Sequence, residues 1–260
     1  MFISVVIPVL NDAAFLASCL AALAKQSRPA DEILVVDNGC TDDSVAIALA
    51  AGARVVVEPR RGILSATSTG FDAAQGEVFA RLDADSLPSA DWLGRVERML
   101  TTHPEAAAIT GTGEFYGGTP WMRWCGKNLI SGGNFRLLAW GLGYTPLYGS
   151  NMAIRASAWY RIRAKVHRDK AVNDDTDITF QFEPDMAALY DPDLKVGVSA
   201  RPFDSLAGLM HRLALAFRAL GINLREQSLW SRRRARREWA RRNATEAAAH
   251  SVDTDRVDRG

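Results

Sequence analysis

Short apolar segments alternate with alanine-rich amphipathic segments through the first hundred residues, and this alternation limits the possible folds more than any other feature. The apolar segments are rich in valine and isoleucine, as strands buried on both faces are. Strand–helix–strand units of this length form parallel sheets with right-handed crossovers, so the sequence predicts an α/β fold with a mostly parallel sheet flanked by helices. The expected strands are 3–8, 32–37, 54–58 and 78–83, and the expected helices are 13–26, 41–51 and 63–74.

The composition is that of a globular protein, with 48% hydrophobic and 23% charged residues in 260. Three widely spaced cysteines, Cys19, Cys40 and Cys125, do not make a disulfide framework or a zinc site, which favours a cytoplasmic location. The apolar N-terminus has no basic region or cleavage site, so we interpret it as a strand and not as a leader. The longest uncharged segment, 137–154, contains several glycines and a proline and is not expected to span a membrane.

The pattern changes near residue 112, where the regular alternation gives way to a segment rich in glycine, tryptophan and tyrosine. We expect one domain over 1–204, with its two halves meeting at residue 112. Two amphipathic, basic helices are expected within 205–242, and a disordered tail over 243–260.

Charge is distributed unevenly along the chain. Residues 201–242 contain 11 arginines and three acidic residues, whereas the formal net charge of the whole chain is only +1. A basic amphipathic helix with Trp230 and Trp239 suits an anionic membrane surface, and a helix packed over the sheet explains the pattern equally well. Nucleic-acid binding is not expected, because the body of the protein is acidic.

Acidic residues follow two of the expected strands. Asp37 ends the second, and Asp83 and Asp85 end the fourth. In open α/β sheets ligands bind outside the carboxyl ends of the strands, so these groups should face one crevice. Residues two apart in an extended segment point the same way, so Asp83 and Asp85 can face one Mg²⁺ or Mn²⁺. Asp37 can instead be a turn or helix-capping residue.

A third acidic cluster, Asp174, Asp175 and Asp177, precedes an apolar stretch. Acids at a helix N-terminus are favoured by the helix dipole, which gives the cluster a structural explanation. The alternative is that one of these carboxylates points into the crevice as a general base.

Several motifs, in their order and spacing, resemble those of family 2 glycosyltransferases. They are SVVIPVLND, VVDNGCTDDS, RLDADSLP, GSNMAIRASAW and NDDTDI, and the resemblance covers about residues 3–200. It implies a GT-A fold that transfers a sugar, with inversion, from a nucleotide-diphosphate sugar to an acceptor hydroxyl. It also implies a divalent cation, Mn²⁺ or Mg²⁺. Residues 1–112 would then be the nucleotide-binding half, and 113–204 the acceptor-side half.

By position in the motifs, the resemblance implies that Pro8, Asp12 and Asp37 line the nucleotide pocket. Asp83 would lie on the ribose side, and Asp85, with Asp83 beside it, would hold the metal that bridges the diphosphate.

The second acid of the family's Glu-Asp motif is usually the base and corresponds to Asp175, with Asp174 in place of the glutamate. Gly149, Ser150 and Asn151 match the segment that borders the donor sugar and the acceptor.

The sequence departs from the family pattern at several positions. Cys40 stands where serine is common, and Thr67-Ser68 where Arg-Asn is common, which removes the usual diphosphate contacts. Arg61, or Arg60 beside it, can compensate for that loss. The Gln-x-x-Arg-Trp motif of processive synthases is missing, which favours a single transfer.

The basic C-terminal helices suggest a carbohydrate or lipid-linked acceptor of the cell envelope, with the protein peripheral at the inner face of the membrane. Tryptophan and tyrosine side chains of the irregular segment can stack on a sugar or lipid, or belong to the core. These are Trp121, Trp124, Trp140 and Tyr144.

Two other functions compete. Asp83 and Asp85 also resemble the nucleophile loop of haloacid-dehalogenase-type phosphatases, with Lys170 as a later partner, although that loop normally follows the first strand. A non-catalytic nucleotide-sugar binding protein is the second alternative.

Overall fold

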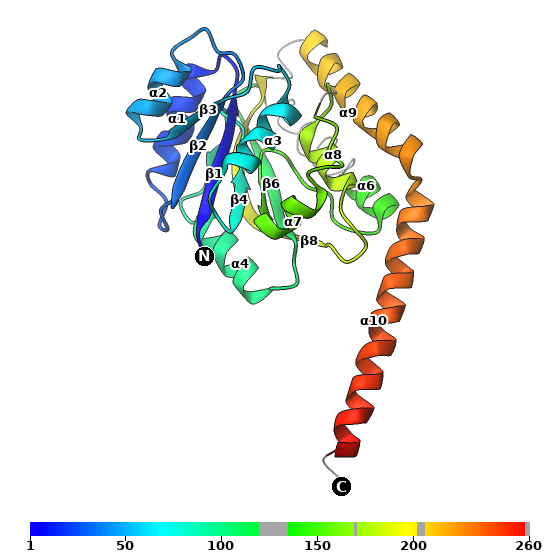
Figure 1. Cartoon of the computed structure of the whole chain (residues 1–260). Helices are drawn as coiled ribbons and strands as arrows, with labels where there is room; N and C mark the ends of the chain where they lie inside the picture. Colours follow the sequence, from blue (N-terminus) through cyan, green and yellow to red (C-terminus); the bar gives the residue numbers. More distant parts are fainter. Residues whose placement is uncertain (120–134, 169–170, 202–205, 258–260) are drawn as a thin grey trace.

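The computed structural model describes residues 1–119, 135–168, 171–201 and 206–257 (Figure 1). Its strands are β1 (Ile3–Val9), β2 (Glu32–Asp37), β3 (Arg54–Val57), β4 (Val78–Arg81), β5 (Leu87–Pro88), β6 (Ala108–Tyr116), β7 (Met152–Arg155) and β8 (Ala188–Ser199). Its helices are α1 (Ala13–Leu23), α2 (Ser44–Ala50), α3 (Ile63–Ala73), α4 (Trp92–Thr102), α6 (Phe135–Leu142), α7 (Ala156–Ile162), α8 (Asp174–Phe180), α9 (Leu206–Glu226) and α10 (Leu229–Val257).

The strands form one sheet in the order β3-β2-β1-β4-β7-β6-β8-β5. The four N-terminal strands are parallel to one another, which confirms the fold expected from the alternating sequence. The chain moves from β1 to β2 and β3 on one side, and α3 then crosses to β4 on the other side of β1. β7 is antiparallel to both of its neighbours and joins the two parts of the sheet.

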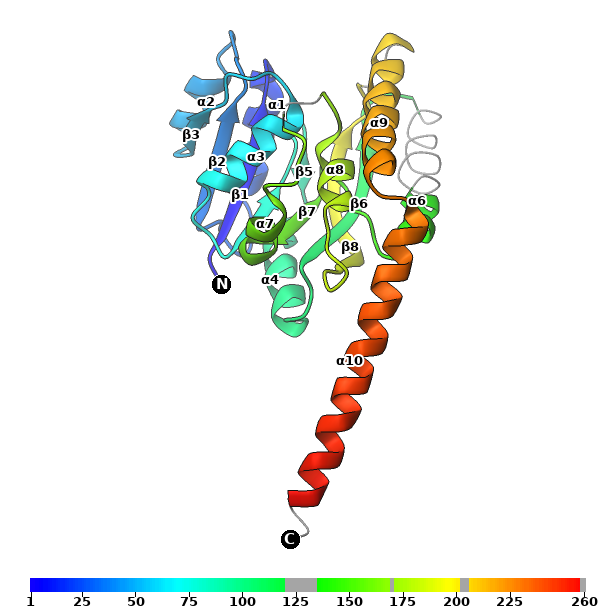
Figure 2. The same ribbon diagram turned by 45° about the vertical axis from the view of Figure 1, so that its right-hand side comes forward.

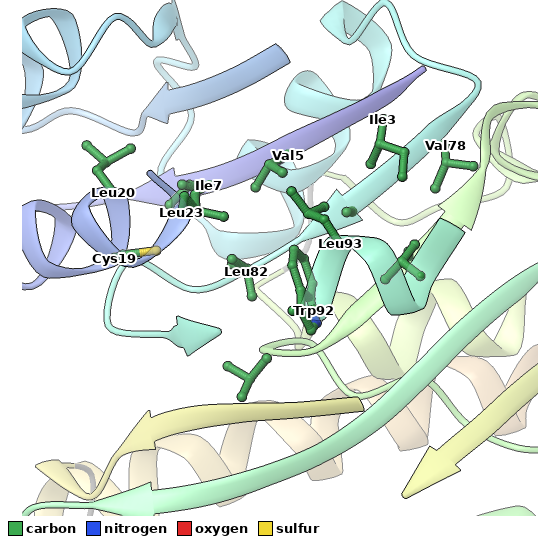
Figure 3. Close-up of a cluster of buried hydrophobic side chains, with 14 of the residues drawn as sticks. Ile3, Val5, Ile7, Cys19, Leu20, Leu23, Val78, Leu82, Trp92 and Leu93 are labelled. Carbon is green, nitrogen blue, oxygen red and sulfur yellow. The ribbon is translucent and has the colours of Figure 1, made fainter. Parts of the chain in front are cut away.

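Two hydrophobic cores lie on opposite faces of the sheet, and alternate residues of β1 supply both. Ile3, Val5 and Ile7 pack with α1 and α4 in the first core (Figure 3), and Val6 packs with α3 and α7 in the second. Successive side chains of a strand point to opposite faces, so a strand covered on both sides must be apolar throughout. This explains the unbroken hydrophobic segments in the sequence.

Two long helices end the chain. α9 packs on α8, and α10 contacts α6 and extends away from the sheet (Figures 1 and 2). α10 continues through residue 257, past residue 242, where we expected the C-terminal helices to end. Alanine and glutamate in residues 244–249 have high helix propensity, which allows the helix to continue past residue 242. Within the described part of the chain, every helix is too short or too polar to cross a membrane.

Candidate active site

A cavity of about 240 Å³ opens at the carboxyl ends of β1 and β4. The connections leave β1 toward β2 on one side and return to β4 on the other, which makes this the topological switch point of the sheet. Four predicted site residues, Pro8, Asp12, Asp83 and Asp85, line the cavity. The sheet therefore brings together carboxylates that are more than 70 residues apart in the chain.

The two carboxylates after β4 contact different arginines, Asp83 with Arg81 and Asp85 with Arg201. β4 ends at Arg81, and a backbone turn over residues 83–86 replaces the extended segment that we expected. Asp83 lies with Oδ1 2.8 Å from Arg81 Nη1, and its Oδ2 accepts a hydrogen bond from the hydroxyl of Ser150. Both side chains nevertheless line the cavity, and one cation held by Asp83 and Asp85 together stays a prediction.

Asp85 is the carboxylate that best suits a divalent cation. Its side chain is 7% exposed, and its Oδ2 lies 3.2 Å from Arg201 Nη2 at the cavity wall. Among the described residues, no group of three or more His, Cys, Asp and Glu is placed to hold a metal. Mg²⁺ and Mn²⁺ need only one or two carboxylates when phosphates and water complete the shell. The residues fit a cation held by Asp85 and a diphosphate, with Asp83 committed to other partners.

Arg81 connects the cavity to the third acidic cluster. Its Nη2 lies 3.0 Å from Asp174 Oδ2, which also accepts a hydrogen bond of 2.6 Å from the hydroxyl of Thr67. Burial lowers the pKa of Arg81, but the negative charges of Asp174, Asp83 and Asp175 raise it by more, so the net shift is upward. The guanidinium is therefore charged, and Thr67 serves to position Asp174.

Asp175 is held beside this ion pair by the chain before β7. Its Oδ2 accepts a hydrogen bond of 2.9 Å from the N–H of Gly149. A Cβ added to Gly149 would lie 3.2 Å from Asp175 Oδ2 and 3.2 Å from Arg81 Nη1. Burial and the charge of Asp174 raise the pKa of Asp175 to about 6, although Gly149 and Arg81 oppose the shift. A carboxylate with a pKa near neutrality is suited to general base catalysis. Asp174 contacts Thr67 and Arg81 of other elements, whereas Asp175 accepts hydrogen bonds both from Gly149 and, at Oδ1, from the N–H of Thr176 in the first turn of α8.

Asp37 and Arg61 are not in the cavity lining. The same holds for the other predicted site residues of the second half of the domain, Gly149, Ser150, Asn151, Asp174 and Asp175. Asp37 Oδ1 accepts hydrogen bonds from the N–H groups of Gly39 and Cys40, at 3.0 and 2.7 Å. This is the turn-stabilising geometry that the sequence left open as an alternative. Arg61 is exposed and donates from Nη2 to the carbonyl of Gly39 at 3.4 Å, which places it next to the same loop.

Asn151 belongs to the core, which corrects the prediction that it borders the substrates. The residue is fully buried, and its Oδ1 accepts a hydrogen bond of 2.8 Å from Trp92 Nε1. Its Nδ2 donates to the carbonyls of Leu194 and Thr112, at 2.6 and 3.0 Å. These bonds occupy the side-chain amide and join α4, β6 and β8.

Arg81 and Arg201 are site residues that the sequence analysis missed. An arginine inside an otherwise apolar strand, two residues before Asp83, was an available signal for Arg81. Arg201 carried no such signal, because it meets Asp85 only through the fold.

The aromatic residues of the irregular segment divide into two groups. Tyr144 belongs to the core, where it stacks on Phe182 and donates a hydrogen bond to the carbonyl of Thr179. Trp140 is 67% exposed. Trp121, Trp124 and Lys170 lie outside the described residues.

Comparison with known proteins agrees with this geometry. The family model "Glycosyl transferase family 2" matches residues 4–163. A glycosyltransferase of Haloferax volcanii, AglE, is 35% identical over 120 residues, which are 43% of this chain and 36% of that protein. The chain therefore spans about a third of that relative.

Two solved structures share the fold. One is a mannosyltransferase from Pyrobaculum calidifontis in complex with GDP-Man and Mn²⁺, at 20% identity and a TM-score of 0.59; the match covers 98% of this chain and 79% of that one. The other is glucosyl-3-phosphoglycerate synthase from Mycobacterium tuberculosis with Mn²⁺, UDP-glucose and phosphoglyceric acid, at 23% identity and a TM-score of 0.58. That match covers 84% of this chain and 79% of the synthase. These similarities confirm the expected GT-A type of α/β fold, and the family match sets the phosphatase alternative aside. The chain belongs to glycosyl transferase family 2.

Proposed function

We propose that this protein is a glycosyltransferase that moves a sugar from a nucleotide-diphosphate sugar to an acceptor hydroxyl. The observation that carries the proposal is the cavity lined by Asp12, Asp83 and Asp85, which Arg81 joins to Asp174 and the neighbouring Asp175. Family membership supports the reaction class. The GDP-Man and UDP-glucose bound in the two related structures support a donor of this kind.

Residues 1–112 would bind the donor. Pro8 and Asp12, which line the cavity, would border the nucleotide, with the loop after Asp37 beside them, and Asp85 would hold a divalent cation. The cation, when bound, stabilises the negative charge that develops on the leaving nucleoside diphosphate. The reaction is therefore proposed to depend on Mn²⁺ or Mg²⁺.

Residues 113–204 would place the acceptor. Gly149 and Ser150 lie between Asp175 and Asp83, so they border the position where the sugar and the acceptor meet. Asp175 takes the proton from the acceptor hydroxyl as the oxygen attacks the anomeric carbon. A displacement with one protein base inverts that carbon, and we propose one transfer per acceptor.

A thermal-shift screen of UDP-, GDP- and dTDP-sugars with and without Mn²⁺ tests the donor assignment, because a bound donor raises the unfolding temperature. We expect one nucleotide class to stabilise the protein with Mn²⁺ and Asp85→Ala to remove the effect. Stabilisation that Mn²⁺ does not change would contradict metal dependence. Donor binding without turnover on any acceptor would favour the non-catalytic alternative. NMR of the anomeric proton and the mass of the product test inversion and single transfer.

We further propose that the acceptor is lipid-linked and that the C-terminal helices hold the protein against the inner face of an anionic membrane. Met210 and Phe217 lie seven residues apart on one face of α9 and are 56% and 69% exposed. Trp230 at the start of α10 is 76% exposed. Arg233 stacks on the exposed Trp140, with its guanidinium carbon 5.4 Å from the ring centroid. Exposed apolar side chains beside arginines are typical of surfaces that enter the lipid headgroup region.

Co-sedimentation with phosphatidylcholine vesicles, with and without phosphatidylglycerol, tests the membrane surface. We expect binding that needs phosphatidylglycerol, weakens with salt and falls in Trp230→Ser. The control is Leu49→Ser, because Leu49 is 58% exposed on α2. Equal retention of both variants, or none of the wild type at low salt, would rule the surface out.

A further inference from the structure

Arg201 is the one cationic side chain among the described residues that line the cavity. It follows the end of β8, and its Nη1 lies 2.7 Å from Asp12 Oδ1 while Nη2 lies 3.2 Å from Asp85 Oδ2. The guanidinium carbon lies 3.7 Å from the ring centroid of Phe15. Two carboxylates and an aromatic face thus hold this guanidinium at the cavity wall.

The same carboxylate of Asp85 is the proposed protein ligand of the cation. A guanidinium and a divalent cation repel each other, and both draw on the negative charge of this side chain. A cation at Asp85 therefore weakens the ion pair between Asp85 and Arg201. The Arg201 side chain is 40% exposed, so it has room to turn away from Asp85.

We propose that Arg201 and a divalent cation exchange at Asp85, and that the released guanidinium then binds the diphosphate of the donor. A guanidinium fork matches phosphate oxygens and binds them through two parallel hydrogen bonds. Thr67, where the family resemblance implies an arginine, is fully buried and donates its hydroxyl to Asp174, so it leaves the diphosphate without a positive charge from α3. Arg201 then supplies that positive charge. This inference rests on the proposed function.

The test is to measure Mn²⁺ binding by electron paramagnetic resonance without nucleotide, and then UDP, GDP and dTDP binding by calorimetry at saturating Mn²⁺. For Arg201→Met we expect Mn²⁺ affinity to rise about fivefold, because a competing cation is removed. Affinity for the preferred nucleoside diphosphate should fall about tenfold, because a phosphate ligand is lost. Arg98→Met is the matched control, because Arg98 is exposed and its pair with Asp91 spans 3.9 Å.

Exchange predicts that Arg201→Met binds Mn²⁺ more tightly and the nucleoside diphosphate more weakly. A purely structural role of Arg201 predicts that both affinities fall. Unchanged or weaker Mn²⁺ binding by Arg201→Met overturns the exchange, as does unchanged nucleotide affinity. The exchange is also overturned if the wild type binds the nucleotide as tightly without Mn²⁺ as with it, because no cation would then be needed to release Arg201 from Asp85. Failure of the wild type to bind any of the three nucleotides with Mn²⁺ refutes the proposed function itself. Thermal unfolding shows whether Arg201→Met is folded, and Arg201→Lys should retain part of the competition.

Discussion

Arg81 and Asp174 form an ion pair, with Nη2 3.0 Å from Oδ2, although both side chains are almost completely buried. They come from β4 and α8, elements on either side of residue 112. Their contact fixes the position of the third acidic cluster relative to the cavity. The properties of this pair lead to the first prediction.

Arg81→Met should destabilise the protein by about 3–5 kcal/mol, because it leaves the carboxylate of Asp174 buried without its counter-ion. Adding Asp174→Asn should restore part of the loss, since the buried charge is then removed. Urea unfolding of the two single variants and the double variant measures this coupling. A loss no larger than that of Arg98→Met would contradict the prediction.

Asp175→Asn should retain donor binding and reduce transfer about 10²- to 10⁴-fold, the usual contribution of a general base. Calorimetry with the preferred donor and a product assay separate the two effects. Asp177→Asn is a poor control, because Asp177 is buried and bonded to His167 and Asn223. Asp91→Asn is a better one, since Asp91 is exposed, accepts a hydrogen bond of 3.1 Å from the hydroxyl of Ser89 and makes a long ion pair with Arg98. Full transfer by Asp175→Asn would place the base elsewhere.

The rate of transfer should depend on the raised pKa of Asp175. A base must be deprotonated, so kcat should rise as pH passes about 6 and level off above it. Less burial of Asp175, or less repulsion from Asp174, should shift the midpoint of the kcat profile to lower pH. A kcat profile for the wild type and for Asp174→Asn checks this, provided that donor is saturating at each pH. A midpoint near 4 would mean that Asp175 has an ordinary pKa.

Gly149→Ala should reduce transfer, because the new Cβ would lie 3.2 Å from Asp175 Oδ2 and Arg81 Nη1, so these atoms must shift by a few tenths of an ångström. The loss should stay below the roughly 10²-fold that a displacement of about 1 Å in a reacting group can cost. Gly221→Ala is the matched control, since a Cβ there meets no atom within 4 Å and alanine favours the helix. Equal activity of both variants would mean that Gly149 has no role in positioning Asp175.

His167 should make the docking of α9 depend on pH. Its Nδ1 lies 2.7 Å from Asp177 Oδ1, and its Nε2 lies 2.8 Å from Glu226 Oε1. Burial lowers the pKa of His167, but the two carboxylates raise it more, so the net shift is upward from 6.5. The stabilisation is therefore present below pH 6.5 and lost as pH rises through the folded pKa. His167→Gln should reduce the free energy of unfolding at about pH 6 more than at about pH 9. An equal loss at both values would show that the charge is not involved.

The position of Asp83 and Asp85 at the cavity followed from the sequence, because the end of a buried parallel strand determines which edge of the sheet a residue occupies. Pro8 and Asp12, which also line the cavity, were expected from the family resemblance, and Asp37 lies outside the lining. The local geometry after β4 did not follow from the sequence, since a turn over residues 83–86 replaces the extended segment that we expected. Asn151 was misassigned because its partners lie on α4, β6 and β8, which are distant in sequence. Arg201 pairs with a residue 116 positions earlier, and no local pattern reports such a contact.

The buried ion pair of Arg81 and Asp174 limits how this chain can be recombined with other members of the family. A chimera with a crossover between residues 85 and 149 would combine an arginine in β4 with an acidic motif from another parent. Where the other parent lacks one partner of this pair, such a hybrid would contain a charge buried without its counter-ion. Chimeras designed to change substrate specificity should therefore take Arg81, Gly149 and Asp174 from the same parent.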